Sequence, residues 1–302
     1  MDVFSGAGAL PAALAMGLFG LLLGSFLNVL ILRLPQMLEA RWKRECAQIQ
    51  GDANPVANTE GASGTSLGTN TGNASPSFNL LSPGSHCPAC KHALAWYHNV
   101  PVFSYLALRG RCAFCGTRIA LRYPVIELAT AALFFACGWR WGWTAEGWTW
   151  SGFCAALLAL GMIDWDTTLL PDDLTLPLLW AGLIAAALGV TPVLLADAVW
   201  GAVAGYLALW SVYWGFKLLT GKEGMGYGDF KLYAALGAWF GWQALIAIIL
   251  LASVIGAIVG IALQALGGLR DGRYVPFGPF LASAGLATLW WGPAALLGLI
   301  GL

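Results

Sequence analysis

Long apolar segments make up most of this chain and constrain its fold more than any other feature. Eight can be delimited, and several are long enough to cross the ~30 Å hydrocarbon core of a bilayer. They lie at about 7–32, 124–139, 148–163, 174–190, 194–218, 230–241, 243–266 and 277–300. Only 10% of the 302 residues are charged, against roughly 25% in soluble domains. The sequence therefore predicts an all-α polytopic membrane protein with about eight transmembrane helices.

The first apolar segment carries a stripe of small residues, which predicts close packing on another helix. The stripe consists of Gly17, Gly20, Gly24 and Ser25. Asn28, near the end of the segment, needs an interhelical partner, and the run from Arg33 to Pro35 is expected to end the helix. No Lys or Arg precedes Arg33, so the basic region of a cleaved signal peptide is missing. We expect the segment to remain in the mature protein.

The polar region after the first segment divides the chain. Residues 1–35 are expected to supply the first transmembrane helix, and residues 36–122 a cytoplasmic domain. Within that domain, about 37–85 is interpreted as a flexible insertion, because its Gly-, Asn-, Ser- and Thr-rich run cannot bury much apolar surface. Residues 86–122 form a small cysteine-containing module. Residues 123–302 are left as a seven-helix membrane core.

Charge distribution predicts the orientation. If residues 33–122 face the cytoplasm, 14 of the 15 Lys and Arg residues lie on that side and only Arg140 lies outside. The positive-inside rule favours this arrangement, which places Asp164 and Asp229 together at the cytoplasmic edge of the membrane. The formal net charge is zero, so charge gives no reason to expect nucleic-acid binding.

Two CxxC pairs in the polar region predict a metal site. They are Cys87 with Cys90 and Cys112 with Cys115, separated by 21 residues. Two such turns can complete a tetrahedral Cys₄ site, for which Zn²⁺ is the usual ion, and four thiolates leave no position for a catalytic water. Reduced or redox-active thiols are the alternative. His86 and His92 flank the first pair and could be alternative ligands, but we expect them to be surface histidines. Cys46, Cys137 and Cys154 are expected to be unpaired thiols.

Basic residues and one buried acid surround this module. Arg109, Arg111, Arg118 and Arg122 form the most basic patch in the chain, which either meets anionic lipid or binds an anionic substrate group. Glu127 lies just inside the next apolar segment, where a carboxylate is costly and therefore suggests a role. It can pair with one of these arginines or contact substrate.

Two carboxylates at the membrane edge are candidates for catalysis. The stretch Gly224–Asp229 (GMGYGD) ends in an acid just before an apolar run, and its glycines allow tight bending and the close approach of another chain. Its expected partner is Asp164. We favour Asp164 over Asp166, because residues two apart on a helix point in different directions and Asp164 belongs to the apolar span. Asp172 and Asp173 are expected to cap the helix that follows.

Asp164 and Asp229, brought together, provide the chemistry of an aspartic protease. Two adjacent carboxylates cannot both ionise easily and share a proton, so that one activates a water and the other polarises the scissile carbonyl. A transporter with an intramembrane proton or cation path also uses such carboxylates. The residues alone leave both possibilities open.

Several motifs, taken together and in order, resemble the bacterial type IV prepilin peptidases. They are GSFLNVLILRLP at 24–35, the paired CxxC module, the LRGRC and RYPVIE runs, IDWDTTLLPD at 163–172 and GMGYGDFKL at 224–232. The resemblance implies an aspartic endopeptidase of the bacterial inner membrane. Such an enzyme removes the leader of prepilins or pseudopilins on the cytoplasmic side and N-methylates the new N-terminus with S-adenosylmethionine.

The resemblance also implies site residues. Asp164 and Asp229 correspond to the catalytic aspartates of the family, and Cys87, Cys90, Cys112 and Cys115 to its zinc-type cysteines. No glycine-rich nucleotide loop after a strand locates an S-adenosylmethionine site. A peptidase without methyltransferase activity is therefore the second hypothesis, and the transporter is the third. The sequence does not identify the particular pilin or the oligomeric state.

Overall fold

Helices form nearly all of the structure. The computed structural model describes residues 9–52, 79–80, 84, 86–87, 89–93, 102–222, 224–266 and 275–300. The α-helices are α1 Ala9–Asp52, α2 Phe103–Ala107, α3 Arg122–Trp141, α4 Ala145–Thr167, α5 Asp172–Ala187, α6 Leu195–Thr220, α7 Tyr227–Phe240, α8 Leu245–Ala265, α9 Gly278–Trp291 and α10 Pro293–Ile300, and a 3₁₀ turn, η2, spans Trp242–Ala244. Among the described residues the only β pairings are two isolated bridges. The predicted all-α class is confirmed.

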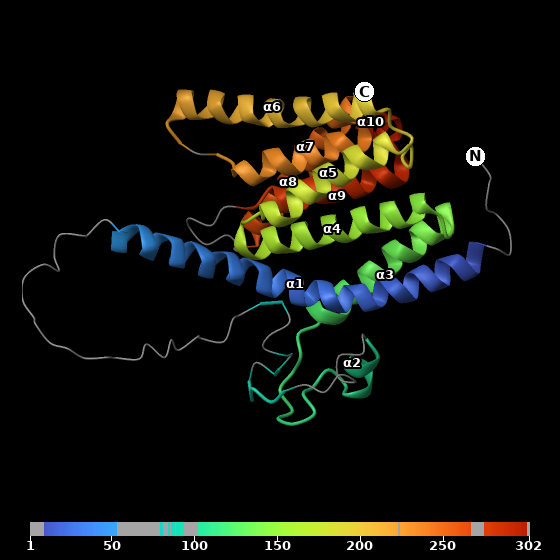
Figure 1. The fold of residues 1–302 in the computed structure, drawn as a ribbon, viewed down its shortest axis with the longest axis vertical. Helices are drawn as coiled ribbons and strands as arrows, with labels where there is room; N and C mark the ends of the chain where they lie inside the picture. The colour runs from blue at the N-terminus through green and yellow to red at the C-terminus, as the bar shows by residue number, and fades with distance from the viewer. Residues whose placement is uncertain are drawn as a thin grey trace, which may run out of the picture.

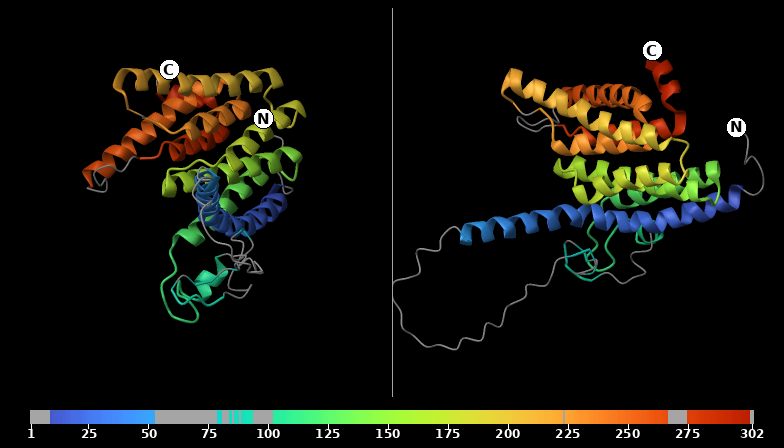
Figure 2. Two further views of the ribbon diagram at one scale, coloured as in Figure 1. Left: turned by 60° about the vertical axis from the view of Figure 1, so that its left-hand side comes forward. Right: turned by 45° about the horizontal axis from the view of Figure 1, so that its top comes forward.

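The helices stack in layers across the molecule (Figure 1). α1 packs mainly on α3, and α4 contacts both α3 and α9. α7 is central to the second half, because it contacts α5, α6, α8 and α9, while α6 lies at the outer edge. The cysteine-containing residues lie below the α1–α3 layer, away from this stack (Figures 1 and 2). The ends of α4, α7 and α9 are thereby brought to one region from distant parts of the sequence.

The first helix is longer than expected. Pro35 was predicted to end it, but α1 continues through Pro35 to Asp52. A proline removes one backbone hydrogen bond and bends a helix, but it does not prevent helix on its C-terminal side. Residues 37–52, predicted as the start of a flexible insertion, are therefore helical and extend beyond the bundle (Figure 2). Most of the low-complexity run, residues 53–78, lies outside the described residues.

Small residues let α1 and α3 approach closely, as predicted. A Cβ atom added to Gly20 would lie 2.7 Å from Phe134 Cβ, and one added to Gly24 would lie 2.7 Å from Glu127 Cα. Asn28 finds the expected interhelical partner, since its Nδ2 donates to the Tyr123 carbonyl at 3.1 Å. The glycine stripe thus fixes how α3, and with it Glu127, is held against α1.

The number of membrane crossings is not confirmed as eight. Three described helical segments are long and apolar enough to cross a membrane: Ala9–Ile49, Leu195–Thr220 and Trp242–Ala265. α5, α7 and α9 have only 16, 14 and 14 residues. At about 1.5 Å per residue they are roughly 21–24 Å long, shorter than the hydrocarbon core.

The segment predicted at 277–300 is also not a single helix. Gly292, with φ 77°, separates α9 from α10, and α10 turns away from the axis of α9 (Figure 2). Positive φ is readily adopted only by glycine, so a glycine at this position ends α9.

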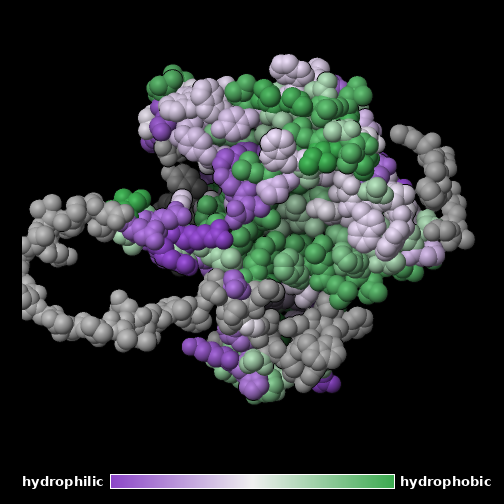
Figure 3. Space-filling model, viewed as in Figure 1, coloured by the Kyte–Doolittle hydropathy of each residue, from purple (hydrophilic) through white to green (hydrophobic). Residues whose placement is uncertain are grey.

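The surface is polarised along the helices. Figure 3 shows hydrophilic side chains gathered at one end, over the second half of α1 and the neighbouring helix ends, while much of the remaining face is apolar. Residues 41–49 of α1 are all exposed and include Arg41, Lys43 and Arg44. This distribution suits a protein whose helices are embedded in a membrane at one level and emerge at the other.

Candidate functional site

Asp164 lies in the last turn of α4 and faces the protein interior, with 4% of its surface exposed. α4 ends just beyond it at Thr167, and the next residue, Thr168, has a left-handed backbone and donates its N–H to the Asp164 carbonyl at 2.8 Å. Carboxylate Oδ2 accepts a 3.0 Å hydrogen bond from the backbone N–H of Gly278, the first residue of α9. A Cβ atom at position 278 would lie 2.5 Å from the same oxygen. The contact therefore requires glycine.

Asp229 lies in the first turn of α7 and is 6% exposed. Gly226 is the N-cap of this helix, and the Asp229 N–H donates to its carbonyl at 3.2 Å. Tight bending was predicted for this stretch, and the backbone bends at Met225, between two of its three glycines, although none of them has a positive φ. Gly228 allows a close contact, since a Cβ there would lie 2.6 Å from Leu170 Cβ. Its closest neighbour is thus the loop that follows α4.

The structure brings these two aspartates together. They come from helices 65 residues apart in the sequence and are near enough for the charge of Asp164 to act on Asp229. Asp229 Oδ1 is buried and has no hydrogen-bond partner among the described residues. Asp164 is thus held by a backbone donor, while one oxygen of Asp229 stays available for a proton or for a bound group.

Three further acidic residues near the site are engaged in ion pairs. The pairs are Asp166 with Arg122, Asp172 with Lys231 at 2.6 Å, and Asp173 with Arg41 at 3.8 Å. Asp166, two positions from Asp164 on the same helix, points toward α3 rather than toward Asp229. The predicted capping role of Asp172 and Asp173 is wrong, because Pro171 is the N-cap of α5 and makes no side-chain capping bond.

The four module cysteines form one cluster. Their sulfur atoms all lie within 4.8 Å of one another, and the Sγ atoms of Cys87 and Cys115 are 3.7 Å apart. Four thiolates around Zn²⁺, with Zn–S of about 2.3 Å, place their sulfurs about 3.8 Å apart. Each CxxC turn is followed by a residue with positive φ, Lys91 at 55° and Gly116 at 69°. The arrangement fits a tetrahedral metal ion.

The electrostatics of these thiols also favour a cation. Hydrogen bonds with Thr117 lower the pKa of Cys115 to about 6, and backbone hydrogen bonds at Cys90 and Ala89 lower the pKa of Cys87. A backbone hydrogen bond from His92 lowers the pKa of Cys90, but desolvation and the other thiols outweigh it and raise that pKa to about 11. Four adjacent thiolates repel one another, and a bound divalent cation removes this cost.

The two neighbouring histidines and the other thiols lie apart from this cluster. The His92 ring packs on Phe114 with centroids 3.6 Å apart, and His86 Nδ1 lies 3.1 Å from the Gly84 carbonyl. Neither histidine belongs to the four-cysteine group. The remaining cysteines are free: Cys46 is exposed, and Cys137 and Cys154 are buried.

Glu127 connects the module to the membrane helices. Its Oε2 accepts a 2.8 Å hydrogen bond from the backbone N–H of Val102, and Ser25 on α1 donates a second hydrogen bond. Val102 has φ 55°, which is rare for a β-branched residue. Among the described contacts, the acid serves as an anchor for the start of α2 and does not pair with the predicted arginines.

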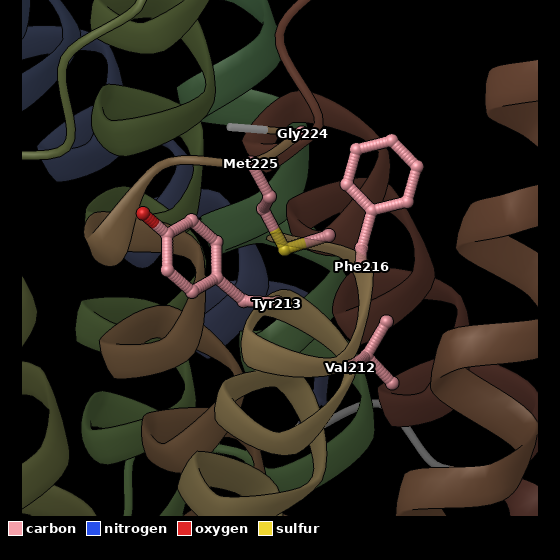
Figure 4. Close-up of a pocket in the computed structure, with 5 residues that line it drawn as sticks. All are labelled: Val212, Tyr213, Phe216, Gly224 and Met225. Atoms are coloured by element: carbon pink, nitrogen blue, oxygen red, sulfur yellow. The ribbon is translucent and has the colours of Figure 1, made fainter. Parts of the chain in front are cut away.

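An apolar pocket lies between α6 and the first two residues of the Gly224–Asp229 stretch. Val212, Tyr213, Phe216, Gly224 and Met225 line it, and in Figure 4 the Met225 side chain lies between the rings of Tyr213 and Phe216. Neither aspartate lines this pocket.

Comparison with known proteins assigns the family. The model of the bacterial peptidase A24 N-terminal domain matches residues 18–141, and that of the type IV leader peptidase family matches residues 151–261. A prepilin leader peptidase/N-methyltransferase of Pseudomonas putida is 50% identical over 90% of this chain and 88% of its own length. The chain belongs to the type IV leader peptidase family.

Other members of the type IV leader peptidase family are equally similar. The prepilin leader peptidase/N-methyltransferase of Aeromonas hydrophila is 51% identical over 91% of this chain and 89% of its own length. That of Burkholderia pseudomallei strain 1026b is 48% identical over 94% and 88%. No solved structure matches this chain. The cysteine cluster lies in the segment matched by the N-terminal domain, and both aspartates lie in the segment matched by the leader peptidase family.

Proposed function

We propose that this protein is a membrane-embedded aspartic endopeptidase that removes the leader of prepilins or pseudopilins and N-methylates the new N-terminus. The observation that carries the proposal is the meeting of Asp164 and Asp229, from distant helices, inside the segment that matches the leader peptidase family. The relatives named above are called prepilin leader peptidase/N-methyltransferase. A transporter has no comparable support.

The chemistry follows from the surroundings of the two carboxylates. Like charges at short range favour a state in which the pair shares one proton. The Gly278 N–H, at the positive end of α9, stabilises negative charge on Asp164. Asp164 then serves as the base that takes a proton from a water, and the protonated Asp229 donates to the oxygen of the scissile carbonyl. Neither step requires a metal ion, which is consistent with a structural role for the cysteine cluster.

The site suits a substrate that enters from the membrane. Asp164 lies in the last turn of α4 and Asp229 in the first turn of α7. The ion pairs described above join neighbouring helices at the same end of the bundle. We place this end in the cytoplasm and the protein in the bacterial inner membrane, because the positive-inside count favours it. A prepilin whose apolar helix lies in the bilayer would then present its leader junction at this level.

Two further assignments accompany the peptidase. We assign a structural Zn²⁺ to the four cysteines, supported by the spacing of their sulfurs. S-adenosylmethionine is assigned as methyl donor from the names of the relatives alone, and no binding residues are proposed. The division into a first helix, a polar module ending near residue 122 and a membrane core from 123 also remains a proposal, since α1 continues well past residue 35.

The decisive experiment is incubation of the purified protein with a prepilin in detergent, with and without S-adenosylmethionine. Product masses report cleavage and methylation together. Asp164→Asn and Asp229→Asn should each reduce leader cleavage by about 10²–10⁴-fold, the usual effect of losing an acid–base group. Asp166→Asn is the matched control, because its carboxylate is occupied by Arg122. Cleavage that survives in either dyad variant would contradict the assignment, and a cleaved but unmethylated product would favour a peptidase alone.

A further inference from the structure

The segment that follows Asp164 returns to contact the helix that carries Asp229. Lys231 lies two residues after Asp229 on α7, and its Nζ is 2.6 Å from Oδ1 and 2.7 Å from Oδ2 of Asp172. Asp172 is the first residue of α5. Asp172 lies only eight positions after Asp164, so this ion pair connects the chain segment that carries Asp164 to the helix that carries Asp229.

The connection between Asp164 and Asp172 packs into the protein at Leu170 and Pro171, whereas Trp165, Asp166 and Thr168 are exposed. Leu170, in the middle of the loop, is 8% exposed. A Cβ at Gly228 would lie 2.6 Å from Leu170 Cβ, and a Cβ at Gly278 would lie 3.1 Å from its Cδ1. The starts of α7 and α9 therefore contact the same leucine. These contacts hold the part of the loop next to Asp172 in place.

The Asp229 carboxylate has a hydrogen-bond contact with the Gly226 backbone, whereas its Oδ1 has no hydrogen-bond partner among the described residues. Its position is set by the first turn of α7, and Lys231 belongs to the following residues of the same helix.

We propose that the Lys231–Asp172 ion pair is a positioning element of the peptidase site, which holds the first turn of α7 so that Asp229 faces Asp164. This inference rests on the proposed function, in which Asp164 and Asp229 are the catalytic pair. The pair lies at the edge of the protein, with 29% of the Lys231 side chain and 53% of the Asp172 side chain exposed. Exposed pairs contribute little to stability, so its effect should appear in catalysis and local order and not in global unfolding.

Three variants test the pair: Lys231→Gln, Asp172→Asn and the double variant. A displacement of about 1 Å at a catalytic group can cost 10²-fold, so we expect each single variant to lose about 10- to 100-fold in kcat with KM changed less than about twofold. The double variant should lose no more than the single ones, because the two residues act as one unit. Lys231→Arg and Asp172→Glu, which keep the charges, should recover most of the activity.

The neighbouring ion pair provides the control. Arg41 and Asp173 join the same first turn of α5 to α1 at 3.8 Å, so Arg41→Gln and Asp173→Asn remove similar charges without touching α7. These variants should leave kcat unchanged. The pH profile gives a readout specific to positioning: if the aspartates separate in Lys231→Gln, their repulsion weakens and the two limbs of the kcat profile move closer together.

Hydrogen exchange provides a test that does not need activity. The amides of residues 227–231 should exchange faster in Lys231→Gln and in Asp172→Asn than in the wild type, and the control variants should not differ from it. Unchanged exchange would overturn the proposal. So would full activity of Asp172→Asn beside an inactive Lys231→Gln, since Lys231 would then act alone on substrate or lipid. A wild-type protein that leaves prepilin uncleaved would instead refute the proposed function.

Discussion

At the scale of single residues, the choice between Asp164 and Asp166 illustrates what local rules can predict. The sequence favours Asp164 because residues two apart on a helix point in different directions. In the structure α4 does continue through both residues, and Asp164 is buried while Asp166 pairs with Arg122 on α3. The catalytic role of Asp164 remains a prediction. The hydrogen bond from Gly278, 114 residues away, was not predicted because no local pattern reports it.

Gly278 provides a residue-scale prediction. In Gly278→Ala the new Cβ would meet Asp164 Oδ2 at 2.5 Å and Leu170 Cδ1 at 3.1 Å, so either Asp164 or the start of α9 must move. We expect leader cleavage to fall by about 10²-fold, the cost of a displacement near 1 Å, while the protein remains folded. The measurement is the single-turnover rate of prepilin cleavage.

Gly260→Ala is the matched control for this substitution. Gly260 lies within α8, and a Cβ there would have nothing within 4 Å. Alanine is favoured over glycine in a helix, so this variant should be fully active and slightly more stable. Normal cleavage by Gly278→Ala would show that the contact with Asp164 is not needed for catalysis.

At the scale of helices, small residues were recognised in one place and missed in another. The stripe on α1 was predicted to pack closely and does so against α3. An equally close contact joins α6 to α7, where Gly201 meets Gly237 and Gly205 lies against the Tyr233 backbone. The spacing of Gly201 and Gly205 is the small-xxx-small pattern of membrane helices, so the signal was present in the sequence. The sequence does not show that α7 is the partner of this pattern, because residue spacing on one helix does not identify the helix that lies opposite.

This crossing leads to a prediction about stability. A Cβ at Gly201 would overlap the carbonyl group of Gly237, so Gly201→Ala must push α6 away from α7. Overpacking typically costs about 1–3 kcal/mol of unfolding free energy. We therefore expect Gly201→Ala to have a lower thermal unfolding midpoint in detergent. Gly215→Ala, on the same helix but with nothing within 4 Å, should not lower it. Equal midpoints for the two variants would show that α6 and α7 can separate at no cost.

At the scale of the whole molecule, the sequence predicted helical class and order well. Apolar length and periodic small residues determine where most helices lie, and all eight predicted segments contain helix. Helix ends were less predictable, since Pro35 lies inside α1 and Gly292 divides a segment that composition alone shows as continuous. The assembly of the site depends on contacts among α4, the loop at Leu170, α7 and α9. These contacts arise from packing between distant segments, on which hydropathy carries no information.

The separation of the cysteine module from the aspartates gives a final prediction. The module is attached to α3 through Glu127 and Val102, whereas the aspartates lie on α4 and α7. Purified protein should contain one zinc ion per chain, measured by elemental analysis, and Cys90→Ser with Cys115→Ser should abolish it. Because structural zinc supplies the folding energy of small modules, metal loss should expose residues 86–121 to limited proteolysis. The fragment from α3 to α10 should stay resistant to the protease, since its packing does not involve the sulfurs of the four module cysteines. Zinc-free protein with a protease-resistant module would contradict the assignment, and cleavage spreading through α4 and α7 would show that the two parts fold as one unit.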